Sequence, residues 1–472
     1  MSRVRRLIEF LVPWVAMTIP GYAAIQRVAT DSVWRDDLPI VRGLGLAALG
    51  GSTTLTTIAM QVASLCPLGP LPFRMALVSV CALCICAGLV FSLARRFVET
   101  HVPGSFLNTP LAGIAALCAT LGPGLQGEAT VAGGATIPLA TGLLVLWVFT
   151  HPDWPQERRH LLASVFLGLL VAESMVAAAI VLTAIVASLI VRKDWPRNGR
   201  QWTALAAMLA AAAVMMLPSL LRPSSPHALL NFGRSFSQFD LASVDSLALP
   251  TTGLSAWRSE VGIVTISIAV LGAVIGLLRK RTRWLVVPLL VVVAADAVFP
   301  ASQGGMLATD LLTPMRSYAI VAMALCACVG VQAVVITLSD TGLSMAKAAA
   351  VLVLLMHFAL VAVTAERAAF SVDRTGTHGA SAYTDEALIK LDPNAMILAR
   401  SHVVVWRLLA AQVVGGVRPD VVVVPLPLIA RGTVAAGVLA LEPGASMMLR
   451  DIALEGTAGE HAISRVSDRR HL

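Results

Sequence analysis

Long runs of apolar residues without charge dominate this chain and limit what it can fold into. One of them, residues 75–94, reads MALVSVCALCICAGLVFSLA. A helix of about 20 such residues crosses the hydrocarbon core of a bilayer. Apolar runs predict helices at residues 7–27, 73–94, 105–122, 135–150, 161–174, 175–191, 201–221, 260–278, 284–300, 317–337 and 346–365. With 57% apolar residues and a mean hydropathy of +0.80, the chain is predicted to be a polytopic membrane protein.

Basic residues predict the orientation of these helices. The net charge of +8 raises the question of a nucleic-acid partner. The basic residues instead cluster in short loops beside the apolar runs, as topology signals do, so no nucleic acid is expected. They are Arg3, Arg5, Arg6, Arg95, Arg96, Arg158, Arg159, Arg192, Lys193, Arg197, Arg200, Arg279, Lys280, Arg281, Arg283 and Lys347. All lie on the cytoplasmic side if residues 161–191 form two helices, which puts the N-terminus inside and the C-terminus outside.

The region 161–191 has two interpretations. As one helix it would extend ~46 Å, too long for a bilayer without strong tilt. As two helices with a turn at Glu173-Ser174, it places the Glu173 carboxylate at the outer interface, where a charge costs less free energy. The arginines at both ends favour the two-helix hairpin.

Several segments are expected outside the membrane on the exported side. The first run resembles a signal peptide, but Pro13 and Pro20 and the lack of a clean small-residue cleavage site favour a retained helix. The exported segments are then 28–72, 222–259, 301–316 and 366–472. Within 28–72, the stretches 38–50 and 53–65 are too short to span and predict helices along the membrane surface.

The tail has a pattern of its own. Residues 395–399 (AMILA) and 421–429 (VVVVPLPLI) are strand-like, and a helical stretch between them ends at Gly415-Gly416, which predicts a parallel β-α-β unit. The expected fold class is an all-α polytopic membrane domain at 1–365, with about 11 transmembrane helices, and a small α/β extracytoplasmic module at 366–472. No P-loop, HExxH, CxxC pair or GxSxG motif occurs, and the seven cysteines indicate no disulfide framework.

Four stretches, in their order along the chain, resemble one family of membrane enzymes. They are RDDLPIVRGLGLAALGGSTTLTTIAMQVASLCPLGPLPFRMALVSVCAL (35–83), HALLNFGRSFSQF (227–239), TDLLTPMRSYAIVAMALCACVGVQAV (309–334) and a tail with LDPNAMILA and VVVWRLLAAQVVGGVRPDVVVVPLPLI. Asp36-Asp37 falls where the family has an acidic cluster, and the tail has an Arg-Pro-Asp turn before its second strand. The chain is therefore similar to the bacterial DUF2723 family, which has the C-type (GT-C) membrane glycosyltransferase architecture and is similar to protein O-mannosyltransferases.

The sequence departs from the family pattern in three places. Gly50-Gly51-Ser52 replaces a His-Pro-Pro stretch, and the Gly-Glu of the acidic cluster is missing. In the tail, RSHVVV replaces a polar Asp-Asn-Asp run after the first strand and leaves only His402 as a polar candidate. Both a diverged member with another substrate and a member that has lost catalysis fit these departures.

The resemblance implies transfer of a sugar from a polyprenyl-phosphate donor to a protein, glycan or lipid acceptor at the outer face of the bacterial inner membrane. Such a reaction needs a carboxylate that takes the acceptor proton and a cation near the leaving phosphate. Asp36 and Asp37 are the expected bases, and alignment with the family favours Asp36. Asp31 is a third carboxylate for substrate binding.

Other polar residues near exported helix ends are candidates for donor contacts. Arginine can give two hydrogen bonds to phosphate oxygens, and the arginines so placed are Arg42, Arg74, Arg234 and Arg316. Asn231 and Asp310 are candidates for contact with a sugar or a metal. No metal-ligand motif occurs, and a divalent metal is left open as a cofactor.

Each of these residues also has a structural explanation. Exported arginines often anchor lipid headgroups, and exposed acids are often only solvated or paired locally. Asp296 lies inside an apolar run, where a charge is either paired or functional. The alternative functions are a non-catalytic scaffold for envelope assembly and, less favoured because no internal repeat is found, a transporter or flippase.

Overall fold

The computed structural model describes residues 3–31, 34, 36–43, 54–193, 200–221, 250–298, 306–340, 344–426, 429 and 432–467. The helices that precede the tail are α1 (Arg3–Ile25), α2 (Asp37–Gly43), α3 (Thr54–Ser64), α4 (Leu71–His101), α5 (Asn108–Thr120), α6 (Pro123–Ala129), α7 (Thr136–Phe149), α8 (Gln156–Glu173), α9 (Met175–Arg192), α10 (Arg200–Leu221), α12 (Pro250–Val261), α13 (Ile263–Leu278), α14 (Lys280–Val298), α15 (Met306–Asp340) and α16 (Ser344–Ser371). The tail contains α17 (Gly379–Ile389), β1 (Met396–Ala399), α18 (His402–Gly415), β2 (Val422–Pro425), α19 (Gly432–Leu441), α20 (Ser446–Glu455) and α21 (Glu460–Ser467).

Every apolar run that predicted a helix contains one in the structure. Five helical stretches of the described residues are long and apolar enough to cross a membrane: Arg6–Ile25, Leu71–His101, Met175–Arg192, Met315–Asp340 and Ala348–Ser371. A sixth is counted if α12 and α13, which are bent by 104° at the break between them, form one broken span. The chain is thus a membrane protein, and the count of about eleven spans stays a prediction.

Three helix boundaries refine the expectations from sequence. Residues 161–191 form two helices, because Ser174 is extended and its hydroxyl accepts the N–H of Ala177 to cap α9. α15 begins at Met306, inside the segment 301–316 that was expected to be an exported loop. α16 continues past residue 365 to Ser371. A continued helix satisfies the backbone groups of the apolar residues there, which a loop near the membrane would leave without partners.

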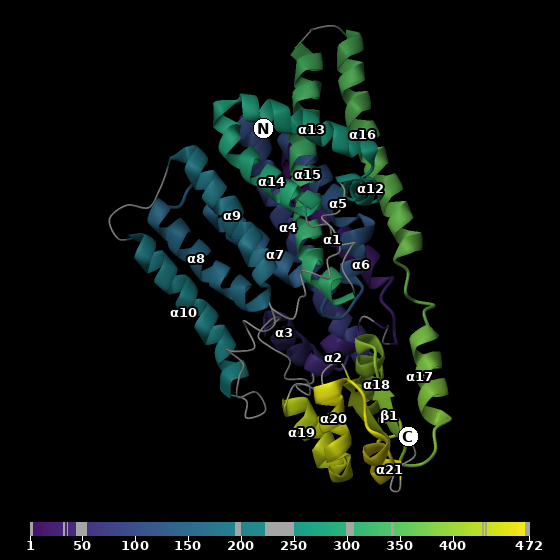
Figure 1. Ribbon diagram of the computed structural model, residues 1–472. Coiled ribbons are helices and arrows are strands. Elements are labelled where there is room, and N and C mark those ends of the chain that lie inside the picture. The colour runs from purple at the N-terminus through teal and green to yellow at the C-terminus, as the bar shows by residue number, and fades with distance from the viewer. Residues whose placement is uncertain are drawn as a thin grey trace.

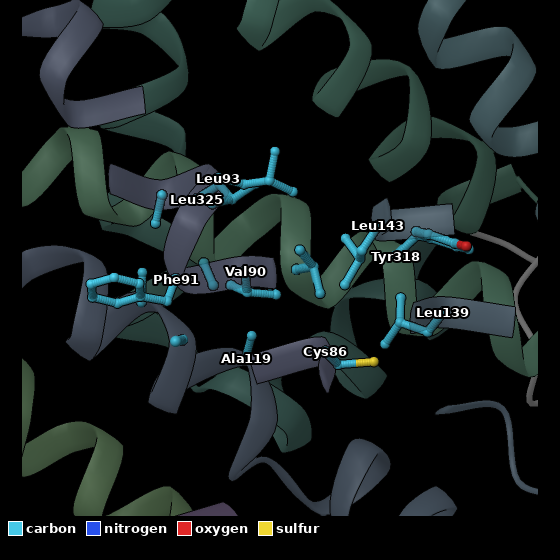
Figure 2. Close-up of a cluster of buried hydrophobic side chains, with 14 of the residues drawn as sticks. Cys86, Val90, Phe91, Leu93, Ala119, Leu139, Leu143, Tyr318 and Leu325 are labelled. Atoms are coloured by element: carbon cyan, nitrogen blue, oxygen red, sulfur yellow. The ribbon is translucent and has the colours of Figure 1, made fainter. Parts of the chain in front are cut away.

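The core of the bundle lies where α4, α5, α7 and α15 meet. Figure 2 shows Val90 and Phe91 of α4, Leu139 of α7 and Leu325 of α15 in one cluster of side chains, and all four are buried. The hydroxyl of Tyr318 donates to the carbonyl of Pro138 at 2.8 Å, so this buried polar group has a partner. In a membrane the hydrophobic effect does not drive helices together, so close van der Waals packing of complementary side chains stabilises their contacts.

α13 and α15 approach each other at two glycines. A Cβ atom added to Gly272 would lie 1.9 Å from the carbonyl oxygen of Cys326, and one added to Gly330 would lie 2.5 Å from that of Ile268. Any side chain at either position would therefore separate the two helices.

Basic loops that were assigned to one side of the membrane are joined by contacts. Arg96 donates to the carbonyl of Trp147 at 2.6 Å, Arg279 donates to the carbonyl of His101 at 3.2 Å, and the guanidinium of Arg192 lies 4.3 Å from the ring centre of Trp284. The tail lies at the end of the bundle where α2 and α3 are found, away from the N-terminus (Figure 1).

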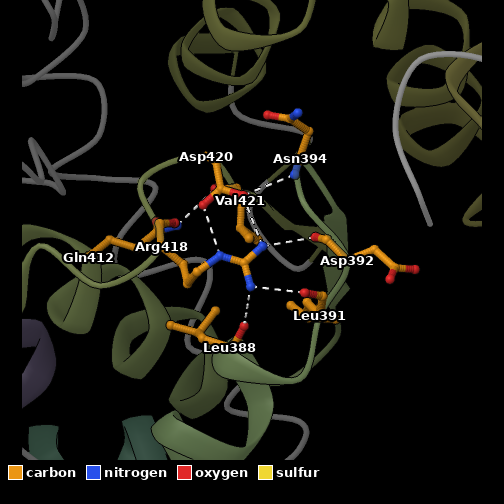
Figure 3. A network of polar contacts seen from close by, with 8 residues as sticks. All are labelled: Leu388, Leu391, Asp392, Asn394, Gln412, Arg418, Asp420 and Val421. Atoms are coloured by element: carbon orange, nitrogen blue, oxygen red, sulfur yellow. Dashed lines mark hydrogen bonds and ion pairs between the residues drawn. The ribbon is translucent and has the colours of Figure 1, made fainter.

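The tail contains two short parallel strands. Met396 pairs with Val422 and Ala399 with Pro425, and α18 connects the strands. The second strand ends at Pro425, short of residue 429. Figure 3 shows the turn before it, where the Arg418 guanidinium binds Asp420 and the carbonyls of Leu388, Leu391 and Asp392 at 2.8–2.9 Å. The Arg-Pro-Asp turn thus joins β2 to the segment that leads into β1.

Candidate functional site

Asp36 directly precedes α2 and is buried, with 2% of its surface exposed. Its carbonyl oxygen accepts the N–H of Ile40 at 2.9 Å, so Asp36 takes part in the first turn of α2. Its carboxylate oxygen Oδ1 accepts the N–H of Ala132 at 2.9 Å, in the connection between α6 and α7. The carboxylate is therefore oriented by a backbone group of the membrane domain.

The α6–α7 connection reaches Asp36 because two glycines allow a tight turn. Gly133 has φ +70°, which a residue with a side chain rarely adopts. A Cβ atom on Gly134 would lie 1.8 Å from the carbonyl oxygen of Glu128. Glu128 is itself buried, and its Oε2 accepts the N–H of Ala135 at 2.8 Å. Two carboxylates, from Asp36 and Glu128, thus bind the backbone of one turn.

Asp37 is fully buried at the start of α2 and is paired with the tail. Its Oδ1 lies 3.0 Å from Nη1 of Arg407 on α18, and the Arg407 side chain is only 7% exposed. Arg407 Nε also donates to the Thr384 hydroxyl on α17 at 2.6 Å. An ion pair this deeply buried is strongly destabilised when one partner is lost.

Asp31 also lies beside the tail, but on the surface. Its carboxylate is 3.3 Å from Nδ1 of His378, and both side chains are more than half exposed. Nearby, the ring centres of Trp34 and Tyr383 are 4.9 Å apart. These two contacts and the Asp37–Arg407 pair connect the segment between α1 and the start of α2 to the tail.

The arginines that were predicted to contact the donor phosphate have different surroundings in the structure. Arg74 donates through Nη1 to the carbonyls of Ser64 and Cys66, both at 2.7 Å, and so caps the end of α3. Arg316 is buried on α15, where its Nε is 2.7 Å from Oδ2 of Asp296. Arg42 lies in α2 and Asp310 in α15, but their side chains lie outside the described residues. Asn231 and Arg234 lie wholly outside them.

The Asp296–Arg316 pair belongs to a second cluster of polar side chains, which also contains Trp257 and Glu260. Trp257 Nε1 donates to the same Asp296 oxygen at 2.6 Å. Glu260, one turn further along α12, accepts the N–H of Gly124 at 2.6 Å, at the start of α6. Glu260 interacts electrostatically with Arg316, Glu128 and Asp296. Asp296, for which the sequence left pairing and function open, is therefore paired.

Sequence analysis missed Arg407, Glu128 and Glu260. Arg407 is the one charge in an apolar helical run of the tail, HVVVWRLLAAQVVG, and Glu128 is the one acid between residues 100 and 150. A lone charge in an apolar segment is a signal for a buried partner, although nothing local says which partner. The described residues contain no group of three or more His, Cys, Asp or Glu that could hold a metal ion.

The structure has the same fold as solved membrane enzymes. ArnT from Cupriavidus metallidurans bound to undecaprenyl phosphate matches with a TM-score of 0.56 and 15% identity, over 89% of this chain and 91% of that one. Its apo state matches with a TM-score of 0.56 and 14% identity, over 89% and 90% of the two chains.

The chain has the GT-C fold. The Archaeoglobus fulgidus oligosaccharyltransferase tethered with an acceptor peptide matches more weakly, with a TM-score of 0.48 and 13% identity, over 88% of this chain and 64% of that chain. No protein-family model matches the sequence, and no curated protein matches it either. The narrower likeness to DUF2723 therefore stays a prediction.

Proposed function

We propose that this GT-C protein is a glycosyltransferase of DUF2723 type that moves a sugar from a polyprenyl-phosphate donor to a protein, glycan or lipid acceptor. The single observation that carries the proposal is the GT-C fold, which this chain shares over 89% of its length with ArnT bound to undecaprenyl phosphate. The reaction would take place at the outer face of the bacterial inner membrane, beside the loop that holds Asp36 and Asp37.

In the proposed reaction, the acceptor hydroxyl gives its proton to a carboxylate while its oxygen forms a bond with the anomeric carbon. The bond between that carbon and the phosphate oxygen breaks, and the electron pair leaves with the lipid phosphate. A cation stabilises the negative charge that develops there. Arg42, Arg74, Arg234 and Arg316 are the proposed source of this cation, with Asp31, Asn231 and Asp310 as further donor contacts.

Asp36 is the preferred base. If Asp37 took the proton, the buried Arg407 guanidinium would lose its counter-charge, which costs free energy. The Asp36 carboxylate accepts the neutral backbone N–H of Ala132, and the alignment with the family also favours Asp36. Asp37 would then hold the loop in place through Arg407 and would not accept the proton.

The test is a transfer assay with purified protein in nanodiscs, a set of polyprenyl-phosphate sugars and an envelope extract as acceptor. Asp36→Asn is expected to lower the transfer rate by about 10²–10⁴-fold, because it removes the base and keeps the shape. Asp37→Asn is the matched control, with a smaller loss expected because the amide oxygen still accepts from Arg407. Full transfer by Asp36→Asn would contradict the assignment of the base.

A non-catalytic scaffold is the second candidate, and one observation favours it. The carboxylates of both Asp36 and Asp37 already bind groups of the protein. A wild-type protein that transfers no sugar from any donor, but whose loss impairs envelope assembly, would support this second function.

A further inference from the structure

The first exported loop is held along the tail by a series of contacts. The carbonyl of Arg27 accepts the N–H of Arg374 at 3.2 Å, Asp31 meets His378, and Trp34 meets Tyr383. Asp37 then meets Arg407. The partners follow the same order in both segments, so Arg27, Asp31, Trp34 and Asp37 contact successive positions of the tail from residue 374 onward.

Only the last of these contacts is buried. The Asp31 and His378 side chains are 52% and 68% exposed, whereas those of Asp37 and Arg407 are 0% and 7% exposed. Exposed ion pairs contribute little, because water screens them, whereas a broken buried pair leaves an uncompensated charge. Among these polar contacts, the Asp37–Arg407 pair is therefore expected to contribute most to the hold of the tail on the loop, beside Val41 of α2, which packs into the hydrophobic cluster of the tail.

Arg407 is itself oriented from a second side. Its Nε donates to the Thr384 hydroxyl at 2.6 Å, and that hydroxyl donates to the carbonyl of Ala380 at 2.8 Å. The guanidinium is thus held between α17 and α2. A planar guanidinium can bridge two such partners, which the single ammonium of lysine does less well.

We propose that Arg407 is a positioning residue: by holding Asp37, it fixes the first turn of α2 and with it the carboxylate of the neighbouring Asp36. The catalytic part of this inference rests on the proposed function. Asp36 belongs to the same turn, since its carbonyl binds the N–H of Ile40. Release of Asp37 would let this turn move, and the distance from base to acceptor would change.

The first experiment measures the hold without any activity. Hydrogen exchange at residues 37–43 of the full-length protein is expected to rise about tenfold or more in Arg407→Ala, because local opening of α2 costs less free energy. Arg407→Lys and Thr384→Val, which perturb the fold less, are expected to give intermediate increases. Arg450→Ala is the control, because Arg450 is an exposed arginine on α20 of the same tail. Unchanged exchange at 37–43 in Arg407→Ala would overturn the inference.

The second experiment measures transfer. Arg407→Ala is expected to lower kcat by about 10–100-fold and to leave KM for the donor within about twofold, because a misplaced base slows the chemical step and not binding. Arg407→Lys should recover part of the loss, and Arg450→Ala should match wild type. Asp37→Asn and Arg407→Ala together should cost less than the sum of the single losses.

The outcomes separate the two proposals. Raised exchange with unchanged kcat would overturn the positioning role. If wild type transfers no sugar and exchange still rises in Arg407→Ala, the proposed function fails, and Arg407 keeps only its role in holding α2.

Discussion

At the scale of single residues, Asp420 is held in its charged form by three hydrogen bonds. Arg418 donates to its two carboxylate oxygens at 2.9 and 2.8 Å, and the N–H of Asn394 donates at 2.9 Å (Figure 3). These bonds, those of Arg418 foremost, hold the pKa of Asp420 well below its ordinary range, and the same pair raises the pKa of Arg418. The carboxylate therefore stabilises the tail only while it is charged.

The consequence is a stability of the tail that depends on pH. In the unfolded chain Asp420 has a pKa of about 3.9, so its contribution is complete above that pH and is lost as the pH falls toward the lower folded pKa. Asp420→Asn is expected to speed hydrogen exchange at β1 and β2 at pH 7, and its difference from wild type should shrink below about pH 4. Asp385→Asn, at an exposed position of α17, is the control. A difference that grows on acidification would contradict the prediction.

At the scale of elements, α3 is attached to the end of α8 by one buried carboxylate. Glu173 accepts the backbone N–H of Thr56 at 3.1 Å and also the Thr56 hydroxyl, and the Thr54 hydroxyl donates to the carbonyl of Ala172 at 3.3 Å. Glu173 is 1% exposed, so these donors replace the water that its charge would otherwise bind. Glu173, which the sequence predicted at a turn near the interface, thus anchors α3.

Thr56→Val tests this anchor. The variant keeps the shape of the side chain and removes one donor to a charged group, which is worth about 1.5–3 kcal/mol. Hydrogen exchange at residues 54–64 is expected to rise by at least tenfold. Thr57→Val, in the same turn, should have little effect, and equal effects of the two variants would show that Glu173 does not hold α3.

At the scale of the whole molecule, the sidedness of the chain decides where the proposed chemistry takes place. The contacts of Arg96, Arg192 and Arg279 join basic loops that a cytoplasmic location would suit. The tail lies against α2 at the other end. An exported tail and a cytoplasmic N-terminus are therefore expected.

Fusion of reporters tests this orientation. An alkaline phosphatase fused after residue 472 should be active, because that enzyme needs the oxidising exported side. The same reporter fused in the α13–α14 connection at Arg279 should be inactive. An inactive reporter at residue 472, with the fusion protein present in full length, would contradict both the topology and the proposed site of transfer.

By itself, the sequence determined the membrane class, the helices and the loop that holds the acids. In a bilayer, the backbone N–H and C=O groups of an apolar run must form hydrogen bonds within the protein, and a helix achieves this within the run itself. Each run therefore predicted a helix. Local signals also identified the turn at Glu173-Ser174 and the strand–helix–strand order of the tail. Helix ends such as the start of α15 were missed, because polar residues interrupt the apolar pattern between residues 306 and 316.

Only the tertiary structure decided which charges meet. Asp36 and Asp37 are neighbours in sequence, yet one binds the backbone of Ala132 and the other binds Arg407, 370 positions away. No local pattern encodes such a pair, because the free energy of a buried ion pair depends on the partner that the fold brings to it. The sequence placed two acids in one loop, and the fold separated their roles by burying each against a different part of the molecule.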